Sequence, residues 1–243
     1  MPDGFSLKRP SNGQPIFSSS TVQYHPLGTI AEDNFGRIFR YTQAGGVTLV
    51  VGNCLQAAAQ IAEHQSMTTA AAAIGDRSIT VTPGAVAGAA DLYAGGMAII
   101  DTTPGIGYSY PVKTHLAITA STAFVIQLQN GATIQVALTT ASKTTLVANP
   151  WKNVIQSPVT TLTNAVVGVC TFPIPTTEYG WTGRNGLFGT LMNSGTAAAV
   201  GTQVGCPSAA AGAATGISGV IQSVGVIMDT LANTLVQGVD WHL

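Results

Sequence analysis

The histidines of this chain lack the spacing that a metal site or a catalytic site requires. The four are His25, His64, His115 and His242, and no two of them form an H-x-H or H-E-x-x-H pattern. Glu63 directly precedes His64, but side chains one position apart on a helix do not face each other. We therefore expect surface or packed histidines, and the sequence predicts no metal site.

Motifs for nucleophilic and carboxylate catalysis are incomplete. Residues 107–111, Gly-Tyr-Ser-Tyr-Pro, begin like a nucleophile elbow but lack its final glycine. Gly105 and Gly107 lack the third glycine of a dinucleotide-binding loop. Glu32 and Asp33 are adjacent acids, but they lie at a predicted turn, where aspartate caps its own backbone. The sequence therefore predicts neither an enzyme nor a cofactor.

The cysteines do not form a disulfide or zinc pattern. Cys54, Cys170 and Cys206 are three in number, far apart, and include no C-x-x-C pair. We expect buried free thiols, which suit a protein that folds in a reducing cytoplasm.

The chain is unusually poor in charge. Only 8% of its 243 residues are Asp, Glu, Lys or Arg, whereas an average soluble domain has about 25%. Membrane proteins avoid charge, but a membrane helix needs roughly 20 consecutive apolar residues, and no such run or secretory signal is visible. A net charge of −1 with scattered basic residues gives no footprint for nucleic acid. An obligate oligomer, with interfaces depleted in charge, fits best.

Two long segments contain no charged residue at all. They lie between Lys113 and Lys143 and between Arg184 and Asp229. One interpretation is that their outer faces are buried against other chains. The alternative is a surface coated by Thr, Ser and Asn, which is polar without being charged. The first interpretation is favoured.

Residues 1–23 are predicted to form an extended N-terminal arm, because their prolines, glycines and Ser18–Thr21 run cannot build a core. The arm is either a disordered tail or a segment that orders on a neighbouring subunit. In the second case Phe5, Ile16 and Phe17 would be its anchors.

Residues 24–243 are predicted to form a β-rich domain, a sandwich or barrel, because short alternating apolar runs are separated by frequent turn residues. One hairpin is expected at residues 29–41, across Asp33–Gly36. A second is expected between 124–128 and 133–138, because an Asn-Gly turn separates two apolar runs. Residues 56–65 favour one short helix, with a strand as the alternative. A boundary near Asn149–Pro150 would give two subdomains.

Aromatic and arginine side chains are the candidate interface residues of this domain. Tyr179, Trp181 and Arg184 belong to the types that dominate binding hot spots. Trp181 could equally be a core residue packed beside Gly180. Trp241 stands near the last residue given, where only docking against the domain or a neighbour would bury it.

The chain resembles a group of tailed-bacteriophage structural proteins over about Tyr24 to Val204. No single segment is specific; their order carries the resemblance, and the sequence departs from the pattern after Trp181, at Thr182–Gly186. The segments that carry it are His25–Ile30, Gly36–Tyr41, Tyr93–Gly96, Gly105–Val112, Asn149–Ile155 and Tyr179–Trp181.

The resemblance implies a capsid decoration or cement protein, which has no catalytic residues to transfer. The expected partners are copies of the chain itself, as a homotrimer, and the major capsid protein. The expected location is the capsid surface of the virion, after assembly in the host cytoplasm. A tail or receptor-binding virion subunit is the alternative.

Overall fold

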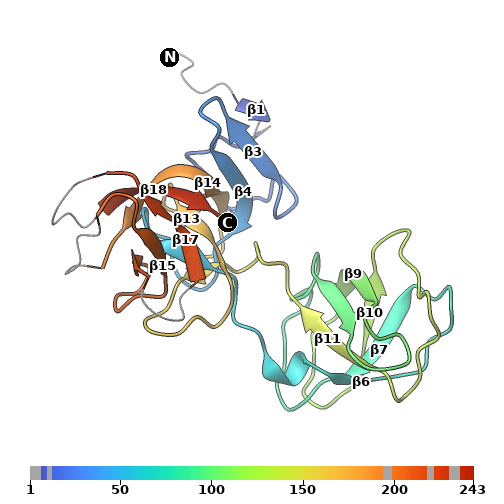
Figure 1. Ribbon diagram of the computed structural model, residues 1–243. Coiled ribbons are helices and arrows are strands. Elements are labelled where there is room, and N and C mark those ends of the chain that lie inside the picture. The colour runs from blue at the N-terminus through green and yellow to red at the C-terminus, as the bar shows by residue number, and fades with distance from the viewer. Residues whose placement is uncertain (1–6, 10–12, 194–198, 218–221, 230–235) are drawn as a thin grey trace. The chain divides into compact units, whose positions relative to one another are not determined.

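The chain folds into two compact units, one inserted into the other. The computed structural model describes residues 7–9, 13–193, 199–217, 222–229 and 236–243. Unit 1 comprises Met1–Ala59 and Pro150–Leu243, and unit 2 comprises Gln60–Asn149. Almost all regular structure is strand, which confirms the mostly-β class (Figure 1). The chain passes between the units at Ala59–Gln60 and at Asn149–Pro150, so residues 24–59 group with residues 150–243, which a single boundary near Asn149–Pro150 does not give.

Unit 1 is built on one large antiparallel sheet. Its main path runs β1-β3-β4-β14-β18-β17-β15-β16, while β2 and β13 also pair with β14, and β5 pairs with β12 and β13. The bounds are β1 (Leu7–Arg9), β2 (Ser19–Ser20), β3 (Ile30–Asp33), β4 (Ile38–Gln43), β5 (Cys54–Gln56), β12 (Ile155–Gln156), β13 (Val166–Cys170), β14 (Tyr179–Leu191), β15 (Gln203–Cys206), β16 (Thr215–Gly216), β17 (Gln222–Ile227) and β18 (Val236–His242).

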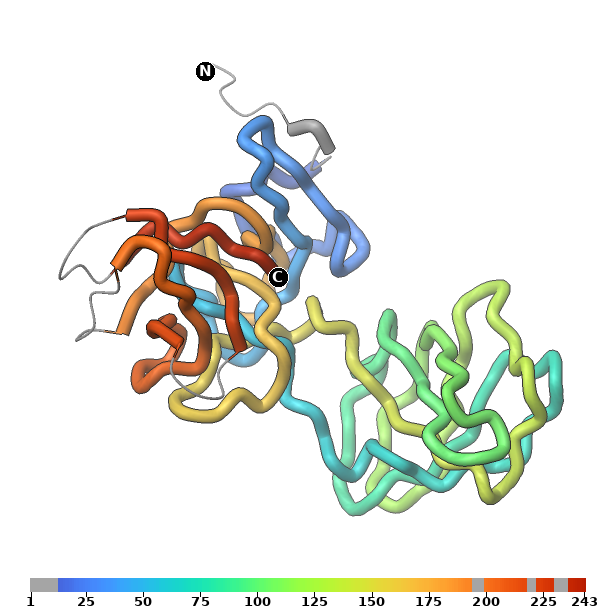
Figure 2. The backbone as a smooth tube through the Cα atoms, viewed as in Figure 1, coloured from blue at the N-terminus to red at the C-terminus, as the bar shows by residue number. Residues whose placement is uncertain are grey.

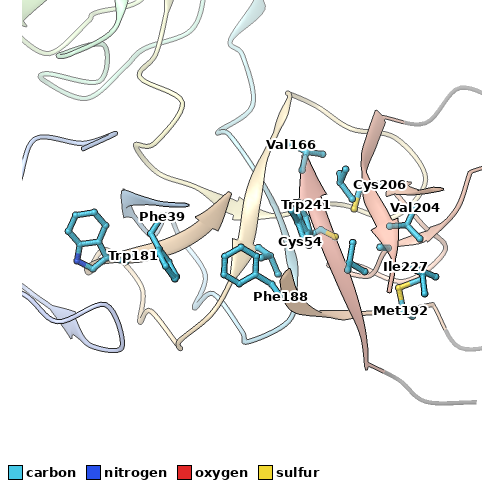
Figure 3. Packing of buried hydrophobic residues seen from close by; sticks show 14 of the residues in the cluster. Phe39, Cys54, Val166, Trp181, Phe188, Met192, Val204, Cys206, Ile227 and Trp241 are labelled. Carbon is cyan, nitrogen blue, oxygen red and sulfur yellow. The ribbon is translucent and has the colours of Figure 1, made fainter. Parts of the chain in front are cut away.

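The 13-residue strand β14 connects the two halves of this sheet. Its first half pairs with β4 and its second half with β18, and the register shifts between Gly183 and Asn185. The ring of Phe188 folds back onto Gly183, where an added Cβ would come within 2.7 Å of it. Figure 3 shows the resulting core running from Trp181 and Phe39 through Phe188 to Trp241. Both halves of β14 therefore contribute side chains to one continuous core.

The hairpin predicted at residues 29–41 is confirmed as β3 and β4, with Ala31 opposite Phe39. Its turn is held by Asp33, whose carboxylate accepts from the backbone N–H groups of Phe35 and Arg37, both at 2.9 Å. The same carboxylate pairs with Arg37 Nε at 2.7 Å. Gly36 supplies the left-handed backbone position, with φ of 77°. Local turn chemistry thus fixes this hairpin.

Unit 2 is a closed six-stranded antiparallel barrel in the order β10-β7-β6-β11-β8-β9 (residues 60–149 in Figure 2). Alternate side chains point inward and fill it, as in small barrels generally, and the buried set includes Ile79, Ile100, Ile126 and Leu146. The bounds are β6 (Met67–Thr69), β7 (Ser78–Thr82), β8 (Met97–Ile100), β9 (Ser109–His115), β10 (Phe124–Leu128) and β11 (Lys143–Val147).

The strand directions place the loops of the barrel at two opposite ends. The chain enters before β6 and leaves after β11 at the same end, together with the loops of residues 83–96 and 116–123. The loops of residues 70–77, 101–108 and 129–142 lie at the other end. We call this the distal end.

Two expectations from the sequence are wrong in detail. Asn130 and Gly131 do form a turn, but residues 133–138 form no strand beside β10. The reason is that β7 and β9 already occupy both edges of β10. The helix expected over 56–65 is reduced to one 3₁₀ turn, Ala62–His64, because β5 takes residues 54–56.

Buried polar groups brace the end of the barrel at which the chain enters. His64 is fully buried, and its Nδ1 lies 2.6 Å from the Tyr93 hydroxyl while its Nε2 lies 3.0 Å from the carbonyl oxygen of Val86. A carbonyl only accepts, so Nε2 carries a proton, and in the neutral imidazole Nδ1 then accepts from the Tyr93 hydroxyl. Burial raises the pKa of Tyr93, which keeps this donor protonated. His115 Nε2 accepts from the backbone N–H of Tyr93 at 3.0 Å.

Replacing Tyr93 with phenylalanine should destabilise the protein, because it leaves His64 Nδ1 buried without its donor. The expected loss is about 1–3 kcal/mol in the free energy of unfolding, measured by denaturant titration. Tyr108→Phe is the matched control, since its side chain is 41% exposed and its loss should be small. Equal stability of the two variants would show that the bond does not support the barrel.

Candidate binding sites

The described part of the N-terminal arm packs into its own unit. Gln14 is buried, and its amide group donates to the carbonyl oxygen of Tyr179 at 2.9 Å and accepts from the Tyr41 hydroxyl at 2.6 Å. The indole N–H of Trp181 donates to the Gln14 carbonyl oxygen at 3.1 Å. β2 then pairs with the start of β14. From Gly13 to Ser20 the segment is therefore part of unit 1, neither a free tail nor an arm on a neighbour.

This changes the status of the three arm anchors. Ile16 is buried in the core of unit 1, so it has no surface to offer another chain. Phe17 is exposed and keeps its candidate status. Phe5 lies outside the residues that the structure describes.

The aromatic interface candidates also lie mostly inside unit 1. Trp181 and Trp241 are fully buried in its core, and the Trp241 indole donates to the Thr190 hydroxyl at 2.9 Å. Tyr179 is half-buried and stacks against Tyr41 at 6.2 Å between ring centroids. In this fold both tryptophans act as core residues, the alternative that the sequence had left open for Trp181.

Arg184 belongs to a cluster that the sequence does not reveal. The guanidinium carbons of Arg40 and Arg184 lie 5.6 Å and 5.3 Å from the ring centroid of Trp151, within cation–π range. Arg40 and Thr182 face each other across β4 and β14, which places Arg184 near Arg40 on the same face. The indole ring of Trp151 packs directly against Gly28, where an added Cβ would lie only 2.7 Å from the ring. We call these three residues the arginine–tryptophan cluster.

The two cations of this cluster have backbone partners but no acidic partner in the part of the chain that the structure describes. Arg40 Nη1 donates to the Gly28 carbonyl oxygen at 2.7 Å, and Arg184 Nη1 donates to the Val167 carbonyl oxygen at 3.3 Å. Arg40 Nε is buried and has no hydrogen-bond partner among the described atoms. Among the described residues, neither guanidinium forms an ion pair. Burial lowers the pKa of both arginines, and the charge of Arg40 lowers that of Arg184 further.

The distal end of the barrel is a braced surface with exposed apolar side chains. The loop of residues 129–142 joins β10 to β11 across the barrel and hydrogen-bonds to both neighbouring loops, through Ile134 O with Gly75 N at 2.9 Å and Ser142 Oγ with Pro104 O at 2.8 Å. Ile74 is 68% exposed and Ile106 61% exposed. Between residues 129 and 142 there is no charged side chain.

The charge-free segments have mixed surfaces. In the barrel, the exposed positions between Lys113 and Lys143 are mostly Thr, Ser, Gln, Asn and Ala, with Leu116 and Val125 as large apolar exceptions. This part therefore matches the polar, uncharged coat that was the alternative interpretation. In unit 1, Leu187 and Met228 are exposed within the second charge-free segment.

The described residues contain no group of three or more His, Cys, Asp or Glu side chains that could hold a metal ion. In the same residues, no helix is long and apolar enough to cross a membrane. Comparison with protein-family models, with curated proteins and with solved structures found no match to this chain.

Adjacent substitutions in the N-terminal segment distinguish core packing from an external contact. Ile16→Ala should cost about 2–5 kcal/mol in the free energy of unfolding, because it empties a buried site. Phe17→Ala, at an exposed neighbouring position, should cost less than about 1 kcal/mol. Denaturant titration of the purified protein measures both. An Ile16→Ala variant as stable as the parent would restore the arm interpretation.

The thiols should be unreactive in the folded protein. All three cysteines are buried and free, and burial raises the pKa of Cys170 to about 12 and that of Cys54 well above its ordinary value. Because the thiolate is the nucleophile, DTNB at pH 8 should label no thiol until guanidinium is added. Burial favours the neutral thiols of Cys54 and Cys170. Their contribution to the free energy of unfolding is therefore fully present below about pH 8.5 and is lost as pH rises through their pKa values in the folded protein. Rapid labelling of one thiol under native conditions would contradict this assignment.

Proposed function

We propose that this chain is a structural subunit of a tailed-phage virion that decorates the capsid and stabilises it by binding. The distal end of the barrel is the observation that carries the proposal. The chain enters and leaves unit 2 at the opposite end of the barrel, so the distal loops contain neither chain crossing. The resemblance to phage structural proteins supports the same role.

The chemistry of the distal end suits a protein partner. Ile74 and Ile106 expose apolar surface on loops that are hydrogen-bonded to a third, so little ordering entropy is lost on binding. Asp76 and Arg77 are exposed on the same loop as Ile74 and can pair with polar groups of a partner. The exposed apolar side chains gain free energy when another protein covers them. A subunit that binds the assembled shell and not its separated parts stabilises the shell by mass action.

A tail or receptor-binding role is the second candidate, and one observation favours it. Tyr108 is exposed at the distal end and stacks on Tyr110, with 6.2 Å between ring centroids. A presented aromatic face can pack against the apolar face of a sugar ring. Binding of the purified protein to a glycan array, lost in Tyr108→Ala, would favour this role over decoration.

Decoration predicts a specific pattern of capsid binding. The double variant Ile74→Ser and Ile106→Ser should bind undecorated capsids at least about tenfold more weakly than the parent chain, because two apolar anchors are lost. Leu116→Ser is the matched control, since Leu116 is 82% exposed but lies at the opposite end of the barrel. Co-sedimentation with capsids measures both. Unchanged binding of the double variant, or loss of binding in the control, would contradict the proposal.

Light scattering tests self-association in the same preparation. A mass of three subunits would support a preformed trimeric cement protein. A mass of one subunit would mean that trimers do not form in solution. Co-sedimentation with capsids would then be the test of the proposal.

A further inference from the structure

We infer that the arginine–tryptophan cluster of Arg40, Trp151 and Arg184 is a binding site for carboxylate groups of an acidic protein segment. The inference is independent of the proposed virion role, because it rests on unit 1 and not on the barrel.

The first support is uncompensated charge. The chain has nine basic residues, and two of them stand against one indole ring without an acidic partner among the described residues. Both arginine residues are partly buried. Two partly desolvated like charges repel each other, and the repulsion is relieved when an anion lies beside both.

The second support is the way in which each arginine is held. Both use Nη1 for a backbone carbonyl, of Gly28 in one case and of Val167 in the other. This leaves Nε and Nη2 of Arg184, the pair of donors that matches the two oxygens of a carboxylate, and Nη2 of Arg40. Arg40 Nε is a buried donor without a partner among the described atoms. Such orphaned donors are rare in folded proteins and call for an explanation.

The third support is the rigidity of the platform. Trp151 is nearly buried, its carbonyl oxygen accepts from Gln43 N at 2.9 Å, and Gly28 leaves room for its ring. Thr42 and Thr182, on the same face, bond to each other at 2.8 Å through their hydroxyl groups and do not compete for the ligand. The cations are therefore positioned before any ligand arrives, which lowers the entropic cost of binding.

A protein carboxylate is favoured over a nucleic-acid phosphate. Binding to a phosphate backbone depends on many basic side chains along one surface, whereas this chain has a net charge of −1. Arginine and tryptophan side by side are typical of protein interfaces. An acidic segment with two neighbouring carboxylates would match the two guanidinium groups.

Nuclear magnetic resonance of the three indole N–H groups tests the inference with controls inside the molecule. A peptide of alternating glutamate and glycine should shift the Trp151 signal. The Trp181 and Trp241 signals should not move, because their indoles donate to Gln14 and Thr190 within the core. The matched glutamine peptide should have no effect, and added salt should weaken the binding of the glutamate peptide.

Variants define which side chains hold the ligand. Arg184→Gln should weaken peptide binding roughly tenfold or more, and Arg184→Lys should restore only part of it because the forked donor geometry is lost. Arg77→Gln, at an exposed arginine of the barrel, should bind like the parent. Unmoved Trp181 and Trp241 signals in each variant show that unit 1 is still folded.

Several outcomes would overturn the inference. A Trp151 signal that does not respond to millimolar peptide would show that the cluster is only a structural contact. A response to inorganic phosphate but not to the glutamate peptide would assign the site to phosphate groups. Equal loss of binding in Arg77→Gln would show non-specific attraction.

Discussion

The contact between the Phe188 ring and Gly183 is the constraint on which unit 1 depends. Both residues belong to β14, so the strand must bend sharply between them, and it does so at the register shift after Gly183. A bulge of this kind bends the strand, so that its two halves can pair with different neighbouring strands. Any side chain at position 183 would occupy the space of the ring. The bend brings Phe39 of the first half against Phe188, with 5.5 Å between ring centroids, and continues the core to Trp241.

The low charge of the chain has two different physical origins. Inside the units, hydroxyl and amide groups satisfy one another, as in the Thr69–Thr144 pair at 2.8 Å and the Gln14 contacts. Outside, much of the barrel is coated by uncharged polar side chains. Large apolar side chains are also exposed elsewhere, among them Leu116 at the opposite end of the barrel and Leu187 in unit 1. What distinguishes Ile74 and Ile106 is that they stand on loops that hydrogen bonds join to a third loop at one end of the barrel.

The sequence predicts local structure well and long-range pairing poorly. The β3–β4 hairpin is predictable because Asp33 and Gly36 specify its turn. The Asn130–Gly131 turn is equally local, but the strand that should follow it has no free edge to join, and edges depend on distant residues. The same holds for residues 13–20, whose composition suggests a loose arm although Gln14 and Ile16 complete a core formed by β4 and β14.

The candidate sites show the same limit. Trp181, Trp241 and Arg184 are picked out by residue type, but type alone does not distinguish a core tryptophan from an exposed one. Arg40, Trp151 and Arg184 are far apart along the chain, and only the pairing of β4 with β14 and the placement of Trp151 over them reveal the cluster. A weak signal was present, since neither arginine has an acidic residue within three positions.

Hydrogen–deuterium exchange of the chain on reconstituted capsids, compared with the free chain, tests the central claim most directly. The account predicts slower exchange in residues 70–77 and 101–108 on the capsid, with little change in residues 83–96 and 116–123 at the opposite end of the barrel. Equal exchange of the distal loops in the two states, or protection confined to the opposite end, would contradict the claim that the distal end is the surface that binds the shell.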